Sequence, residues 1–187
     1  MRMNPKILIG ICSALFALSA CTSSDTTTEA GSERPTVVVT YSVLGSIVEQ
    51  LVGDAATVTT LIPDGQDPHE FEPSAKDIES LNNANIVVSN GLDFEEGLEE
   101  TLENAKTAGV NVFMAGDHIT VRELNDEGHD HGSFDPHLWL SPAAMLEMLP
   151  ELSETIGVAI GVDLSVQLET LVAELTALDT EIQEIIS

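Results

Sequence analysis

Two histidines follow an Asp-Pro pair directly, and they have the clearest capacity for chemistry in the chain. They are His69, in Asp67-Pro68-His69, and His137, in Asp135-Pro136-His137. Proline fixes its own φ and holds the preceding aspartate extended, so each imidazole stands on a stiffened turn. Two such turns can hold two neutral imidazoles in fixed positions, as the binding of a metal ion requires.

Other candidate ligands surround these two turns. His118, His129 and His131 lie in the predicted loop between them, and Glu70 directly follows the first turn. A lone loop histidine or turn carboxylate is usually only solvated, so His118 and Glu70 are auxiliary candidates. The segment 127–132 places two imidazoles among carboxylates and glycines, which favours loose metal capture. Imidazoles favour Zn²⁺ over Mn²⁺, which prefers harder oxygen ligands.

The elements that must position these residues alternate between short β-branched runs and longer helical periods. Strands are predicted at 36–40, 57–62, 85–89 and 110–114. This alternation predicts an α/β fold, with a parallel four-stranded sheet and helices on both faces. Ligand sites on such sheets lie beyond the carboxyl ends of the strands, so both Asp-Pro-His turns can reach the same edge.

Apolar spacing predicts the helices. The first covers 43–53 with Val43 on its buried face, and the second begins at a capping box formed by Ser74 and Asp77, with Ile78 and Leu81 inward. An acidic helix is expected over 94–106, and another helix runs from Pro142 to about residue 156. A long helix with an apolar stripe is then predicted from residue 163 to the end.

The amino-terminal residues read as an export signal. Residues 1–20 contain Arg2, Lys6 and an apolar run too short to span a bilayer, which is typical of a cleaved signal peptide. Cys21 follows Leu18-Ser19-Ala20, a pattern that looks like the cleavage box of bacterial lipoproteins, with the cysteine lipidated. The alternative is an ordinary leader with an incidental cysteine. Residues 21–34 are polar and predict a flexible tether.

Taken together, these motifs resemble the zinc- and manganese-binding solute receptors of bacterial ABC importers. The resemblance covers nearly the whole chain. It departs at Ser141, where the family often has aspartate in Trp-Leu-Asp-Pro. The residues that carry the resemblance are the lipoprotein-type leader, Thr40-Tyr41-Ser42, Pro68-His69-Glu70 with Pro73-Ser74 behind it, the histidine-bearing loop, and Asp135-Pro136-His137-Leu138-Trp139-Leu140.

The resemblance implies a function. In that family a metal is held between two α/β lobes joined by a long helix, and the first lobe supplies two histidines. His69 and His137 match that pair, whereas the second-lobe ligands have no counterpart here. The expected organisation is therefore one metal-binding lobe at 35–160 and a connecting helix at 161–187 that stops within the helix. Such a chain should bind metal more weakly than a two-lobed receptor.

The implied role is to capture Zn²⁺, or alternatively Mn²⁺, outside the cytoplasm and deliver it to a membrane permease driven by a cytoplasmic ATPase. The protein would be lipid-anchored at the cell surface or in the periplasm, and it would catalyse no reaction. The alternatives are an extracytoplasmic metal buffer or adhesin, a non-functional fragment, and a metal-dependent hydrolase. The hydrolase is the weakest, because the chain lacks His-Glu-x-x-His and a serine elbow.

Composition limits the partners further. The 187 residues carry a formal net charge of −26 and are 43% hydrophobic, which supports one globular lobe and excludes nucleic acid as a partner. The acidity has two interpretations: it supports solubility, which is favoured because the acids are spread along the chain, or its negative field concentrates divalent cations near a site. The only cysteines are Cys12, inside the leader, and Cys21. The mature chain is therefore expected to have no internal disulfide and no thiolate metal site.

Overall fold

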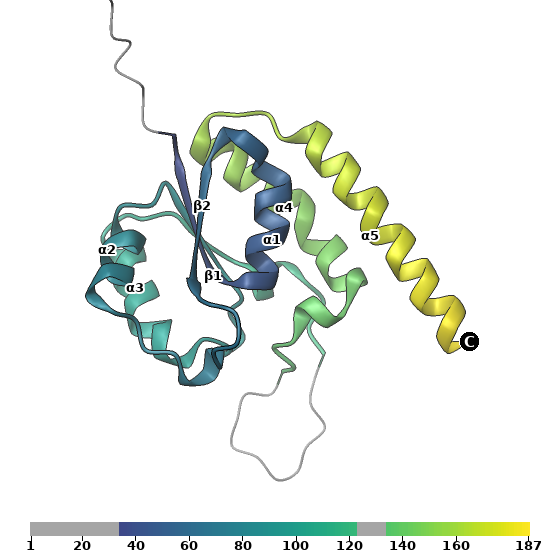
Figure 1. The fold of residues 1–187 in the computed structure, drawn as a ribbon, viewed down its shortest axis with the longest axis horizontal. Coiled ribbons are helices and arrows are strands. Elements are labelled where there is room, and N and C mark those ends of the chain that lie inside the picture. Colours follow the sequence, from purple (N-terminus) through teal and green to yellow (C-terminus); the bar gives the residue numbers. More distant parts are fainter. Residues whose placement is uncertain (1–33, 123–133) are drawn as a thin grey trace, which may run out of the picture. The chain divides into compact units, whose positions relative to one another are not determined.

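A parallel four-stranded sheet forms the centre of the lobe, in a computed structural model that describes residues 34–122 and 134–187 (Figure 1). The strand order is β2-β1-β3-β4, and every pairing is parallel. The strands are β1 (Thr36–Tyr41), β2 (Thr57–Ile62), β3 (Ile86–Ser89) and β4 (Val112–Met114). All four predicted strands are confirmed, with shifts of one or two residues at some ends.

The middle of the sheet is the core. Val37, Val38 and Val39 of β1 are fully buried, and they pair with β2 on one side and with β3 on the other. Strands covered on both faces are near-continuous apolar runs, which explains the valine-rich sequences of β1 and β3. The strand order reverses between β1 and β3, and in open parallel sheets ligands bind beyond the strand ends at such a point.

Helices cover both faces of the sheet, as predicted (Figure 1). One layer holds α1 (Ser42–Val52), α4 (Pro142–Ile160) and α5 (Ser165–Ile186), with α5 packed on both α1 and α4. The other layer holds α2 (Ala75–Asn82) and α3 (Glu99–Thr107), which contact each other. None of the helices in the described ranges is both long enough and apolar enough to cross a membrane.

Local capping explains where α2 and α4 begin and end. The predicted capping box is present, because the Ser74 hydroxyl accepts from the Asp77 backbone N–H while the Asp77 carboxylate accepts from Ser74. Helix α4 extends past the predicted end at residue 156, to Ile160. It stops where Gly161 adopts a left-handed φ of 73° and closes the helix.

Three sequence predictions about the helices are wrong. Val43 and Ile78 were expected to point inward, but they are 43% and 39% exposed. The acidic helix does not cover all of 94–106. A 3-10 turn occupies Glu96–Leu98, and α3 begins only at Glu99.

The conformation of the chain just before α3 is set by a turn of left-handed residues rather than by helical periodicity. Leu92 and Asp93 both adopt left-handed conformations, with φ of 56° and 58°, and they follow Gly91 at 73°. This turn brings Phe94 and Glu95 into the interior, where each is 3% exposed. The acidic composition of 94–106 did not predict the burial of Glu95.

The last helix, α5, is confirmed as long and amphipathic. Leu171 is buried, whereas Leu168, Val172 and Leu175 are partly buried against the core. Toward its end the packing becomes sparse. Among the large apolar residues of α5, the exposed ones are Val166, Leu178, Ile185 and Ile186.

Candidate metal site

The two Asp-Pro-His turns are built by the same hydrogen bond. The Asp67 carboxylate accepts from the backbone N–H of His69 at 3.0 Å, and the Asp135 carboxylate accepts from the backbone N–H of His137 at 3.0 Å. Each aspartate thus closes a turn across the intervening proline, which adds to the restriction that proline imposes. Sequence reasoning used the proline but missed the carboxylate, although the aspartate two residues before each histidine was the signal.

The turns bring their imidazoles together beyond the carboxyl ends of the strands. The ring centroids of His69 and His137 are 6.4 Å apart, with an angle of 63° between the ring planes. Both residues are solvent-exposed. For two imidazoles on one tetrahedral zinc at about 2.0–2.1 Å, the centroids would lie about 5 Å apart. A shared ion therefore requires the two rings to approach each other by roughly 1 Å.

An aromatic floor lies beneath the two histidines. Phe94 is 3% exposed, and its ring contacts His69 edge-on at 5.2 Å and His137 at 6.2 Å between centroids. Trp139 packs on Phe94 at 4.7 Å, and Tyr41 packs on Phe94 at 5.1 Å. This floor restricts ring rotation on the buried side and leaves the opposite side open to solvent. Trp139 belongs to the Asp135-Pro136-His137-Leu138-Trp139-Leu140 motif, whereas no sequence signal identified Phe94.

One histidine is oriented much more tightly than the other. Nδ1 of His137 lies 2.8 Å from the Asp135 carboxylate, so with Asp135 ionised Nδ1 carries the proton and Nε2 presents a lone pair. The backbone and side-chain hydrogen bonds from His137 lower the pKa of Asp135 below its usual value. The ring of His69 makes no hydrogen bond to the described parts of the chain. His137 is the preorganised ligand of the pair, and His69 is the adaptable one.

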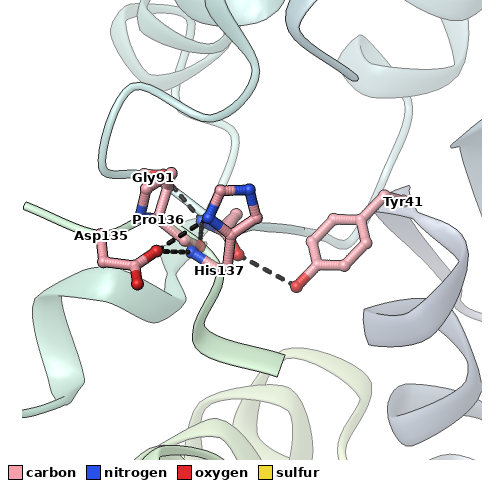
Figure 2. A network of polar contacts seen from close by, with 6 residues as sticks. Tyr41, Gly91, Asp135, Pro136 and His137 are labelled. Carbon is pink, nitrogen blue, oxygen red and sulfur yellow. Dashed lines mark hydrogen bonds and ion pairs between the residues drawn. The ribbon is translucent and has the colours of Figure 1, made fainter. Parts of the chain in front are cut away.

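A polar network joins the His137 turn to Asn90 and Tyr41 (Figure 2). The Asn90 side-chain amide donates to the carbonyl of Pro136 at 2.9 Å and accepts from the Tyr41 hydroxyl at 3.0 Å. Glu95 accepts from the backbone N–H of Asn90 at 2.8 Å. Burial raises the pKa of Glu95, and burial together with the nearby Glu95 carboxylate raises the pKa of Tyr41.

The remaining predicted ligands do not join the pair. His118 is half-buried and stacks flat on Phe113, with centroids 4.3 Å apart, away from the Phe94 floor. Glu70 is exposed beside His69. Across residues 34–122 and 134–187, no group of three or more His, Cys, Asp or Glu side chains is arranged to hold an ion. His129, His131 and Cys21 lie outside the described residues.

This fold and this arrangement of histidines agree with the comparison to known families. Residues 37–187 match the protein family described as zinc-uptake complex component A, periplasmic. The chain belongs to this family. Its core strands, both Asp-Pro-His turns and α5 all lie within the matched region, which confirms the resemblance read from the sequence.

Individual relatives support the same assignment. The chain is 34% identical over 146 residues to the iron ABC transporter substrate-binding lipoprotein MtsA of Streptococcus pyogenes, covering 75% of this chain and 46% of MtsA. It is 32% identical over 146 residues to the manganese ABC transporter substrate-binding lipoprotein PsaA of Streptococcus pneumoniae, with the same two coverages. A zinc-bound deletion mutant of ZnuA superposes with a TM-score of 0.69 at 27% identity, covering 82% of this chain and 58% of ZnuA.

Two consequences follow from these matches. The relatives are substrate-binding proteins of transporters rather than enzymes, which agrees with the prediction that the chain catalyses no reaction and removes support from the hydrolase alternative. The chain also spans about half the length of the curated relatives it matches.

Proposed function

We propose that this chain binds a divalent metal ion through Nε2 of His137 and a ring nitrogen of His69, as the substrate-binding component of a metal ABC importer. The observation that carries the proposal is the pairing of the two Asp-Pro-His turns, which places the imidazoles 6.4 Å apart at one sheet edge. The Asp135 contact leaves Nε2 of His137 available for the ion. His129, His131 and Glu70 are proposed as auxiliary ligands only, whereas His118, whose ring stacks on Phe113, is not proposed as a ligand.

Zinc is the proposed ion, with manganese as the alternative. Both paired ligands are imidazoles, which suit Zn²⁺ better than Mn²⁺. The relatives do not decide between the ions, because their names specify iron for MtsA, manganese for PsaA and zinc for the family. The proposal of zinc rests on donor chemistry.

The cellular setting follows from the sequence and the family. We propose that residues 1–20 are removed on export, that Cys21 is lipidated, and that residues 21–34 tether the lobe to the outer face of the membrane. The relatives MtsA and PsaA are named lipoproteins, which supports this arrangement. The lobe at 35–160 would pass its ion to a permease driven by a cytoplasmic ATPase. Residues 161–187 would form the connecting helix.

Calorimetric titration of the purified protein with Zn²⁺ and with Mn²⁺ near pH 7 tests the proposal. We expect one stoichiometric zinc site, tighter than the manganese site, and a loss of zinc affinity of about tenfold or more in both His69→Ala and His137→Ala. His118→Ala is the matched control, because its ring stacks on Phe113 outside the pair, and it should bind as the parent does. Parental affinity in both His69→Ala and His137→Ala would refute the site.

Acid should release the ion, because an imidazole must be deprotonated to bind a metal. Repeating the titration at about pH 5 should therefore weaken zinc binding sharply. The buffer or adhesin alternative predicts the same ion site. It differs in having no permease partner, and no feature of the described residues favours it.

A further inference from the structure

Asn90 occupies a central position behind the second Asp-Pro-His turn. It follows β3 at the carboxyl edge of the sheet and is completely buried. Its side-chain nitrogen donates to the carbonyls of Pro136 and Gly91, both at 2.9 Å, and its side-chain oxygen accepts from the Tyr41 hydroxyl at 3.0 Å. Both donor hydrogens and the acceptor oxygen are therefore used, and the amide orientation is set by its partners.

The bond to Pro136 acts on the peptide unit that carries His137. The carbonyl of that unit accepts from Asn90, and its N–H, which belongs to His137, donates to Asp135. Both ends of one peptide plane are thus fixed by side chains (Figure 2). In the first turn, Asp67 holds the N–H of His69, but no side chain in the described ranges holds the carbonyl of Pro68.

Glu95 holds Asn90 in place. Its carboxylate accepts from the backbone N–H groups of Asn90 at 2.8 Å and Gly91 at 3.2 Å, and from the Thr40 hydroxyl. The left-handed residues Leu92 and Asp93 turn the chain back, so that the Glu95 side chain can reach the residues that directly follow β3. Strained backbone of this kind persists only where surrounding contacts hold it, and it clusters at functional sites.

We propose that Asn90, held by Glu95, is a positioning residue that presets His137 for metal capture. This inference rests on the proposed function, because it requires His137 to be a ligand. A carboxamide is needed at this position, since only it can donate to two carbonyls and accept from a hydroxyl at once. An ionised aspartate has the same shape but no donor, so it would face the Pro136 carbonyl with a repelling oxygen.

Asn90→Asp is therefore the main test variant, made in the full-length protein and compared with the parent. We expect zinc affinity, measured by competition with a chromophoric chelator, to fall by about 10- to 100-fold, as for other residues that orient metal ligands. In the metal-free protein, nitrogen NMR of the imidazoles should show His137 losing its single Nδ1-protonated form. A purely structural role for Asn90 would leave that tautomer signature unchanged in the folded variant.

Leu171→Ala is the control for lost stability, because Leu171 is buried in α5 and far along the chain from the site elements. It should lower the melting temperature but keep parental zinc affinity. Tyr41→Phe is a milder second variant. It removes only the hydroxyl that fixes the Asn90 amide, so it keeps the test open if Asn90→Asp does not fold, and it should weaken zinc binding several-fold.

The results separate the two proposals. Parental zinc affinity in His137→Ala would refute the proposed function, and the role of Asn90 with it. If His137→Ala loses zinc affinity but Asn90→Asp binds zinc like the parent, only the positioning role of Asn90 is overturned. If Asn90→Asp does not fold, parental zinc affinity in Tyr41→Phe overturns that role instead. The same holds if Leu171→Ala loses as much affinity as the Asn90 variant.

Discussion

The Asp135 carboxylate accepts two hydrogen bonds from His137, one from its backbone N–H at 3.0 Å and one from Nδ1 at 2.8 Å. Asp67, in the matching turn, accepts only the backbone N–H of His69. Two turns with the same sequence Asp-Pro-His therefore differ in how far they fix their imidazole. In the second turn, the aspartate both closes the backbone and selects the ring nitrogen that faces the solvent.

This difference predicts unequal effects of removing the two aspartates. Asp135→Ala should lower zinc affinity by about 10- to 100-fold, because the His137 ring loses the acceptor that sets its tautomer and its basicity. Asp67→Ala is the matched control, since it removes only the backbone bond, and it should lower affinity less. Titration calorimetry on both variants measures this. Equal losses would show that turn closure alone matters.

Trp139 should report metal binding directly. It is the only tryptophan in the sequence, and its ring lies 5.3 Å from the His137 ring and 4.7 Å from the Phe94 ring between centroids. Drawing His137 toward a shared ion changes the surroundings of the indole, so zinc should shift or quench its fluorescence. The midpoint should match the calorimetric affinity. In His137→Ala the change should disappear, and a signal retained there would place the ion elsewhere.

Gly97 controls how the first turn packs. Any Cβ at this position would collide with the carbonyl oxygen of Phe71, which directly follows the 3-10 turn Pro68–Glu70 that carries His69. Gly97→Ala should therefore displace that segment, lower the free energy of unfolding by about 1–3 kcal/mol and weaken zinc binding. Urea unfolding and calorimetry measure the two effects.

Gly109→Ala is the control for that experiment. Gly109 has a left-handed φ of 94° but open space where a Cβ would lie. Substitution there should cost about 1 kcal/mol from backbone strain alone and leave zinc affinity unchanged. If Gly97→Ala also keeps parental zinc affinity, the packing of the two 3-10 turns does not position His69.

The sequence predicted the sheet and the two stiffened Asp-Pro-His turns because both depend on local signals. The buried β-branched runs predicted all four strands. The Asp-Pro-His sequence predicted both turns, whatever their positions in the fold. The capping box at Ser74 was likewise readable, since its two residues lie three positions apart. Such patterns determine local geometry almost independently of the rest of the fold.

The residues that hold the histidines in place could not be predicted in the same way. Phe94 and Glu95 lie in a segment whose acidic composition is typical of a solvated helix, but the left-handed Leu92 and Asp93 turn both side chains inward. The Asn90 side chain donates to the carbonyl of Pro136, which lies far along the chain, and only the folded sheet brings the two residues together. Val43 and Ile78 were misplaced because periodicity gives a helix an apolar face without saying how much of it the sheet covers.

Glu95 leads to a pH prediction whose sign is opposite to that of an ordinary ion-paired carboxylate. Burial raises its folded-state pKa, whereas the unfolded chain keeps a glutamate pKa of about 4.3. The stabilisation from its protonated form is fully present below the unfolded pKa and is lost as pH rises through the folded pKa. The parent should therefore lose stability relative to Glu95→Gln, which cannot ionise, as pH rises from about 4 to 7.

Urea unfolding of both proteins across that pH range measures the difference, and the many surface carboxylates cancel because the two chains share them. Glu95→Gln also faces the Gly91 N–H with an amide nitrogen in place of an acceptor, which adds a cost that does not vary with pH. The test is therefore how the difference in free energy of unfolding between the two proteins changes with pH, rather than its size at one pH. A difference that stays flat, or grows in favour of the parent with rising pH, would show that the donors on Thr40, Asn90 and Gly91 outweigh burial.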